Sequence, residues 1–135
     1  MTYEEVKDRI IEVAAVHLPE TPEDMASRIK IEVLEAHLLY TARARGILEE
    51  ARLAMEDRYE EIDDTWRKLT GYEMYLNGKP KSQTDIDEAK RQVDPNLFGE
   101  RRLIMKLLRQ VGNQIRRLEK DDAVASRSYT MLTGS

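Results

Sequence analysis

The sequence predicts an all-α protein: a long, coiled-coil-like antiparallel helical hairpin with a short helix at its N-terminus, assembled into an oligomer. Charged residues make up 36% of the chain and aromatic residues only 6%, which suits amphipathic helices better than one thick core. Apolar residues recur at steps of three and four along most of the sequence. We therefore assign residues 1–135 to a single helical domain.

A short helix is expected within residues 1–18. Thr2 and Glu5 have the spacing of a capping box, in which each side chain serves a free backbone group at the helix start. The apolar residues that follow fall on one helical face, and Leu18-Pro19 ends the helix, since the residue before a proline disfavours helical geometry.

One continuous helix is predicted over residues 22–76, about 80 Å long at roughly 1.5 Å per residue. Thr21-Pro22 supplies a cap followed by proline at the first helical position. The predicted apolar stripe repeats every eleven residues, which favours a nearly straight helix. It comprises Met25, Ile29, Val33, Ala36, Tyr40, Ala44, Ile47, Ala51, Met55, Ile62, Trp66 and Leu69, with Arg58 as a polar exception.

Residues 77–84 form the only turn-rich stretch, so the tip of the hairpin is expected there. The C-terminal helical segment covers residues 85–133, and Asp94-Pro95 predicts a cap for its last helix. The apolar positions of that helix follow a seven-residue period, interrupted by Arg101 and Asp122, as in a left-handed coiled coil. They are Leu97, Ile104, Leu108, Val111, Ile115, Leu118, Ala125, Tyr129 and Leu132.

Several function classes find no support in the sequence. Cysteine is absent, which excludes disulfides and thiolate metal sites and favours a cytoplasmic location. No uninterrupted apolar run has the length of a membrane span, so we expect no membrane partner. The carboxylate pairs Glu32/Glu35 and Glu61/Asp64 resemble the metal sites of helical pyrophosphohydrolases. On one straight helix, however, Glu32 and Glu61 would lie about 44 Å apart, so we expect no enzyme, no metal and no cofactor.

Charge is distributed in blocks. Residues 49–64 contain eight acidic and two basic residues, whereas residues 100–120 contain seven basic and two acidic ones. In an antiparallel hairpin these blocks would face each other, so mutual neutralisation is the favoured explanation, with Arg116, Arg117 and Lys120 left over.

The predicted tip interleaves aromatic and basic residues, and Glu73 is its only acidic residue between positions 66 and 81. Such a segment suits single-stranded nucleic acid, because cations follow the phosphates and aromatic rings stack on bases. An equally weighted alternative is that Trp66 and Leu69 finish the apolar stripe and the lysines keep a turn soluble. The candidate nucleic-acid-binding residues are Arg67, Lys68, Tyr72, Tyr75, Lys79 and Lys81.

The order of these parts resembles the UvsY-type recombination mediators of tailed bacteriophages. The resemblance rests on the segments 72–78 and 89–97, on Val93-Asp94-x-x-Leu97 in particular, and on the leucine-rich helix that follows. It implies a small helical protein that forms a ring, binds single-stranded DNA and helps a recombinase to replace single-strand-binding protein. For a phage protein the location would be the host cytoplasm.

The resemblance also implies roles for the residues. Those at the tip would bind DNA, and the C-terminal helix would form the homo-oligomer through Ile104, Leu108, Val111, Ile115, Leu118 and Tyr129. The alternative is a coiled-coil structural or adaptor protein, such as a phage assembly or virion component, with protein partners only. The net charge of −4 favours that alternative.

Overall fold

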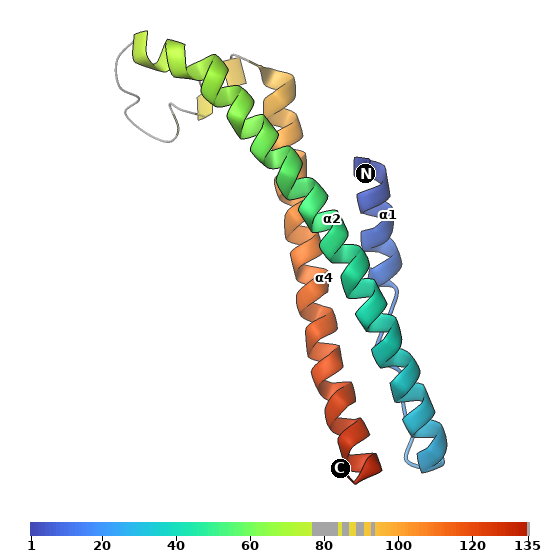
Figure 1. Cartoon of the computed structure of the whole chain (residues 1–135). Coiled ribbons are helices and arrows are strands. Elements are labelled where there is room, and N and C mark those ends of the chain that lie inside the picture. Colours follow the sequence, from blue (N-terminus) through green and yellow to red (C-terminus); the bar gives the residue numbers. More distant parts are fainter. Residues whose placement is uncertain (77–83, 85–86, 89–90, 93, 135) are drawn as a thin grey trace. The chain divides into compact units, whose positions relative to one another are not determined.

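The computed structural model describes the chain except residues 77–83, 85–86, 89–90, 93 and 135, and the side chains of residues 69–76 are also outside the description. Helix α1 spans Tyr3–Ala14, α2 spans Ser27–Leu76 and α4 spans Pro95–Thr133 (Figure 1). No strand occurs among the described residues, so the all-α prediction is confirmed. Most of the predicted turn at 77–84 lies outside the described residues.

The chain divides into two compact units. Unit 1 consists of Met1–Arg52 and Arg109–Ser135, and unit 2 of Leu53–Leu108. Unit 1 therefore contains α1, the first part of α2 and the second part of α4. Unit 2 contains the remaining segments of α2 and α4.

The predicted start of α1 is confirmed. Thr2 is the N-cap, and its hydroxyl oxygen accepts a hydrogen bond from the backbone N–H of Glu5 at 3.1 Å. The helix ends at Ala14, earlier than the predicted 18. The N–H of Val16 bonds the carbonyl of Val13 at 3.1 Å in a tighter turn, and residues 16, 18 and 19 are half-buried in the non-helical connection.

The prediction that α2 begins at Pro22 is wrong, because the helix begins at Ser27. The N–H of Met25 bonds the carbonyl of Pro22 at 3.0 Å and closes a single turn. That turn does not propagate, and the helical series starts with the N–H of Lys30 on the carbonyl of Ala26 at 3.0 Å. From Ser27 the helix runs without interruption to Leu76, as predicted for its body.

The predicted eleven-residue stripe on α2 is also wrong in its first half. Ile29 and Tyr40 are 47% and 42% exposed. The buried row steps instead by alternating threes and fours, a seven-residue period, and admits two polar side chains, His37 and Thr41. In unit 1 it comprises Leu34, His37, Thr41, Ala44, Leu48 and Ala51.

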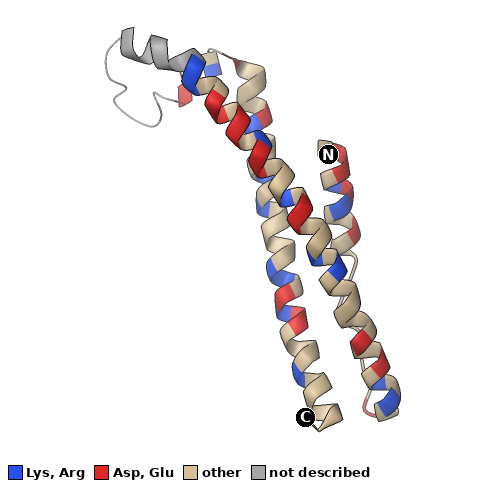
Figure 2. Ribbon diagram, in the orientation of Figure 1, with Lys and Arg blue, Asp and Glu red and all other residues tan. Residues whose placement is uncertain are grey.

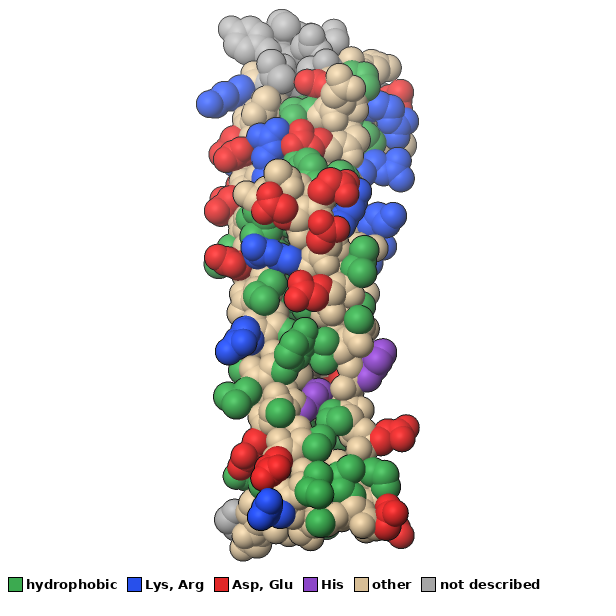
Figure 3. Space-filling view, turned by 90° about the vertical axis from the view of Figure 1, so that its right-hand side faces the viewer, with side chains coloured by type: hydrophobic (Ala, Val, Ile, Leu, Met, Phe, Trp, Pro, Cys, Tyr) green, Lys and Arg blue, Asp and Glu red, His purple; other side chains and the backbone are tan. Residues whose placement is uncertain are grey.

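The core of unit 1 contains apolar side chains from all three of its helical segments. Helix α1 buries Val6, Ile10 and Val13. From α4 the buried side chains are Val111, Ile115, Leu118 and Ala125. Some large apolar side chains stay outside this core, and Figure 3 shows hydrophobic side chains on the surface of the part of unit 1 where α2 begins.

A polar layer crosses the core of unit 1. The hydroxyl of Thr41 donates a hydrogen bond to the carboxylate of Asp122, and Arg45 contacts the same carboxylate at 3.4 Å. Asp122 is the polar residue that interrupts the apolar row of α4, so the exceptions in the two rows are partners. Because a buried polar group without a partner is costly, this layer favours one register of α2 on α4 in this unit.

Arg117 attaches α1 to α4. Its guanidinium donates to the carbonyl oxygens of Val13 at 2.8 Å and Val16 at 2.7 Å. Carbonyls at a helix C-terminus lack partners within the helix and carry partial negative charge, so a cation is favourable there. Arg117 thus acts as a C-terminal cap of α1 that is supplied by another helix, a role that the sequence did not indicate.

Unit 2 has a smaller core in which Met55, Ile62 and Trp66 of α2 and Ile104 and Leu107 of α4 are buried. The predicted start of α4 is confirmed, since the carboxylate of Asp94 accepts a hydrogen bond from the N–H of Leu97 at 3.0 Å.

The polar exceptions of both rows again find partners in unit 2. Arg58 binds Glu100 through two bonds of 2.7 and 3.1 Å. Arg101 binds Asp63 at 3.3 Å and the hydroxyl of Tyr59 at 2.5 Å, and it lies over the ring of Trp66. Thr41, Arg58, Arg101 and Asp122, which break the apolar rows, therefore make polar contacts between helices of their own unit, whereas the buried Nε2 of His37 has no hydrogen-bond partner among the described residues.

Candidate nucleic-acid interface

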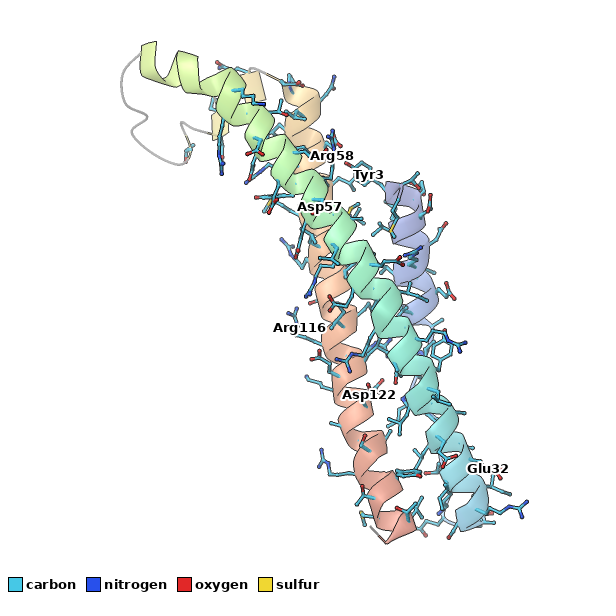
Figure 4. The ribbon with its side chains drawn as sticks, in the orientation of Figure 1. Tyr3, Glu32, Asp57, Arg58, Arg116 and Asp122 are labelled. Carbon is cyan, nitrogen blue, oxygen red and sulfur yellow. The ribbon has the colours of Figure 1, made fainter. Side chains whose placement is uncertain are left out.

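Helix α4 carries a row of cations on the face opposite its core. We name Arg109, Arg116, Lys120 and Arg127, all exposed and all in unit 1, the cationic stripe. They follow one another at steps of seven, four and seven residues, which keeps them on one side of a helix. Val111 and Leu118, buried on the same helix, point the opposite way. Figure 4 shows Arg116 directed away from α2 and Asp122 directed towards it.

The cationic stripe is electrostatically unneutralised within the described part of the chain, where none of its four residues has a carboxylate within ion-pair distance. Arg116 donates to the amide oxygen of Asn113 at 2.5 Å, a neutral acceptor one turn earlier. At about 1.5 Å per residue the stripe is roughly 27 Å long. A linear row of free cations of this length matches a polyanion better than a small anion.

In unit 2 the exposed residues Arg102 and Lys106 continue the same spacing on the other segment of α4. The expected neutralisation of the basic block by the acidic block of α2 is therefore mostly wrong. Arg101 is the described member of the basic block that has an ion pair with α2, and Arg117 binds α1 and Asp121. The remaining cations of α4 are exposed because they lie opposite the buried row. Figure 2 marks the positions of basic and acidic residues along the helices.

The predicted tip site is only partly within the described residues. Arg67 and Lys68 lie exposed on α2, and Arg67 pairs with Asp64 at 3.3 Å. The backbone of Tyr72 and Tyr75 is helical, but their side chains, and Lys79 and Lys81 entirely, lie outside the description.

Trp66 has no part in such a site as a stacking platform, since it is 1% exposed. Its ring lies 6.1 Å from that of Phe98, and Arg101 lies 5.6 Å from its centroid. For this residue the core explanation is correct.

The predicted oligomerisation residues are largely covered within one chain. Ile104, Val111 and Leu118 have no exposed surface and Ile115 is 7% exposed, whereas Leu108 is half-buried. The part of α4 that remains accessible is therefore its cationic side.

Tyr129, also predicted to join copies, is half-buried and donates its hydroxyl to Glu35 at 3.1 Å. This hydrogen bond to a carboxylate, together with the negative charge of Glu35, raises the pKa of Tyr129 above 10.0. Its side chain thus has a partner within unit 1.

The carboxylates considered for an enzyme have other partners. Glu32 lies 3.8 Å from Arg28, Glu61 lies 2.9 Å from Arg58, Asp64 binds Arg67, and Glu35 accepts from Tyr129. Within the described ranges, no group of three or more His, Cys, Asp or Glu could hold a metal ion. Nor does any described helix have an apolar stretch long enough to cross a membrane.

An acidic counterpart lies on α2 in unit 2. We name Asp57, Glu60, Glu61 and Asp64 the acidic patch; all four are exposed. Glu61 forms an ion pair with Arg58 and Asp64 with Arg67, both on α2. No described cation lies within ion-pair distance of Asp57 or Glu60. The exposed side chain of Leu53, 56% accessible, lies one turn before Asp57 on the same side of the helix.

No family model, no curated protein and no solved structure matches this chain. The resemblance to recombination mediators therefore rests on the sequence alone, through segments 72–78 and 89–97 and the leucine-rich helix that follows.

Sequence reasoning missed the cationic stripe, although its signal was present. Arg102, Lys106, Arg109, Arg116, Lys120 and Arg127 all lie on one helical face, opposite the heptad row. The block of residues 100–120 does not reveal this face by its charge alone, because it also includes Arg101, which binds Asp63 of α2, and Arg117, which binds α1.

Proposed function

We propose that this protein is a non-enzymatic recombination mediator that binds single-stranded DNA as a homo-oligomer and assists recombinase loading. The observation that carries the proposal is the cationic stripe, four exposed cations in a row on α4 with no carboxylate partner among the described residues. Such cations attract backbone phosphates and release the counterions condensed on them. Their number is modest, so each copy contributes weak, salt-dependent binding.

In this proposal α2 and α4 form one long antiparallel hairpin with its tip at residues 77–84. The tip residues Arg67, Lys68, Tyr72, Tyr75, Lys79 and Lys81 form a second contact with DNA. Because aromatic stacking requires unpaired bases, the tip would supply the preference for single strands, while the cationic stripe would contact phosphates only.

Assembly then converts weak sites into tight binding. The copies of one oligomer bind the same DNA strand. When one copy releases the strand, the other copies keep that strand close to it, so it rebinds at a high effective concentration. A ring of this kind would keep DNA available for a recombinase while single-strand-binding protein is displaced. No cofactor is required, and the setting would be the cytoplasm of a host cell.

The test is fluorescence anisotropy with a labelled thymidine oligonucleotide at several salt concentrations. Removing one cation that binds a phosphate should reduce the slope of log affinity against log salt by about 0.7. The double variant Arg109→Ala/Arg127→Ala, which removes the two cations at the ends of the stripe, should therefore reduce the slope by about 1.4, twice that amount. Arg28→Ala/Arg43→Ala removes the same charge from exposed positions of α2 and should leave the slope nearly unchanged.

Equal decreases in the two double variants would mean that only net charge matters, which contradicts a site on α4. Lys79→Ala/Lys81→Ala tests the tip separately, and discrimination between single-stranded and duplex oligonucleotides should fall in that variant.

A second candidate function is a coiled-coil structural or adaptor protein with protein partners only. It is favoured by the acidic patch and by exposed apolar side chains such as Leu39, which is 74% accessible. Wild-type protein that fails to bind the oligonucleotide at low salt would support this candidate and exclude the mediator.

A further inference from the structure

The cationic stripe and the acidic patch have complementary charges at similar spacing. On α2, Leu53, Asp57 and Glu60 are separated by four and three residues. On α4, read in the opposite direction, Val124, Lys120 and Arg116 are separated by four and four. All six side chains are exposed, with Leu53 56% and Val124 44% accessible.

We infer that the acidic patch of one copy docks on the cationic stripe of a second copy, with the two helices antiparallel. Leu53 then faces Val124, Asp57 faces Lys120 and Glu60 faces Arg116. This deepens the proposed function by identifying the surfaces through which copies associate, and it rests on the homo-oligomer of that proposal.

Charge and apolar surface both favour a second copy as the occupant. Asp57, Glu60 and Lys120 lack oppositely charged partners among the described residues, and Arg116 is bonded there only to an amide. Docking would neutralise these charges, and the Leu53–Val124 contact would remove two exposed apolar side chains from water. Exposed ion pairs are individually weak and screened by salt, so association through this contact is salt-sensitive.

The contact joins two different surfaces, so it is heterologous. Each copy that donates its acidic patch still offers its own cationic stripe to the next, which generates a ring or an open chain of copies. The docked segment from Leu53 to Glu60 covers about 10 Å of a stripe roughly 27 Å long. Arg109 and Arg127, at the two ends of the stripe, thus remain open to phosphates.

Charge reversal tests the pairing, with light scattering of the protein alone as the readout. Asp57→Lys/Glu60→Lys and Arg116→Glu/Lys120→Glu should each reduce the mass to that of the 15.7 kDa chain, while circular dichroism stays helical. An equimolar mixture should recover the wild-type mass, because the two variants complement each other. Wild-type protein that is monomeric at low salt, or a mixture that stays monomeric, would overturn the inference.

Cross-linking tests the direction. The chain has no cysteine, so introduced thiols have no background. Leu53→Cys protein mixed with Val124→Cys protein should form a mixed disulfide under mild oxidation. A Leu53→Cys protein that instead links preferentially to an Asn113→Cys protein, seven residues before Lys120 on the exposed side of α4, would indicate parallel helices and would overturn the arrangement.

These measurements contain no nucleic acid, so they separate the two ideas. Failure of oligonucleotide binding removes the proposed function and leaves the association result intact. Loss of association in Asp57→Lys/Glu60→Lys, with oligonucleotide binding retained per copy, supports the docking surface and the DNA site independently.

Discussion

The hydroxyl of Thr41 donates a hydrogen bond to the carboxylate of Asp122, 81 positions later in the chain. Thr41 is fully buried, and each of the two residues interrupts a row of mostly apolar side chains. Unit 1 therefore matches a polar position of α2 with a polar position of α4. Any shift of one helix along the other would place these groups against apolar side chains, which is unfavourable.

Replacing Thr41 by valine tests this relationship. The variant keeps the volume but removes the donor, so we expect the free energy of unfolding in urea to fall by about 1–3 kcal/mol. Asp122→Ala should cost a similar amount, and the double variant should cost clearly less than the sum of the two.

Thr65→Val is the matched control, because Thr65 is exposed and its hydroxyl donates to the carbonyl of Glu61 on its own helix. Its unfolding free energy should change by a few tenths of a kcal/mol at most. Strict additivity of Thr41→Val and Asp122→Ala would show that the two side chains do not act as a pair.

The helix starts with strong local chemistry were predictable from the sequence. The side chain of Thr2 caps the N–H of Glu5, and that of Asp94 caps the N–H of Leu97. Each capping bond joins residues three positions apart, so these helix starts do not depend on distant contacts. Thr21-Pro22 carries a similar signal, yet α2 begins at Ser27. There the turn closed by Met25 on the carbonyl of Pro22 does not continue into the helix, and a local capping pattern does not indicate whether a first turn will propagate.

The buried face of α2 was not predictable from hydrophobicity alone. Ile29 and Tyr40 look like core residues and are exposed, while His37 and Thr41 look like surface residues and are buried. What decides between the two faces is the opposing helix, whose row includes Asp122. The same holds for the cationic stripe. The outward face of α4 is defined only once the buried residues, such as Val111 and Leu118, define its inward face.

Arg117→Met should loosen α1 without unfolding the rest of unit 1. The variant keeps most of the aliphatic stem but lacks the bonds to the carbonyls of Val13 and Val16, each a charge-assisted interaction. We expect amide hydrogen exchange in Tyr3–Ala14 to accelerate roughly 10- to 100-fold, the factor for about 1.5–3 kcal/mol.

Arg116→Met serves as its control, because it removes the same charge from the neighbouring position and the guanidinium of Arg116 is hydrogen-bonded to Asn113 on its own helix. Exchange in α1 should stay at the wild-type rate in that variant. Equal acceleration in both variants would point to a general effect of charge and not to an interaction at the end of α1.

Arg101→Lys should be visible in the fluorescence of Trp66, the only tryptophan of the chain. The guanidinium lies 5.6 Å from the indole centroid and also holds Asp63 and Tyr59, a geometry that an ammonium group does not reproduce. We expect the indole to become more exposed to solvent, with a red-shifted emission and easier quenching by acrylamide. Arg102→Lys, on the exposed side of α4, should leave the spectrum unchanged.

The hydrogen bond between Tyr129 and Glu35 predicts a stability loss at alkaline pH. It favours the protonated phenol in the folded chain and raises the pKa of Tyr129 above the unfolded value of 10.0. The stabilising contribution is therefore complete below pH 10.0 and disappears as pH rises through the folded-state pKa.

Glu35→Gln removes the negative charge that raises this pKa, so Tyr129 should then titrate closer to 10.0. The measurement is the near-ultraviolet absorbance of phenolate, taken as the difference between each protein and its Tyr129→Phe derivative, because the chain has six tyrosines. Identical difference titrations with and without Glu35→Gln would show that the hydrogen bond is not maintained in solution. A lower midpoint in the variant would establish that α2 and α4 are paired at this end of unit 1, since the two residues lie 94 positions apart in the chain.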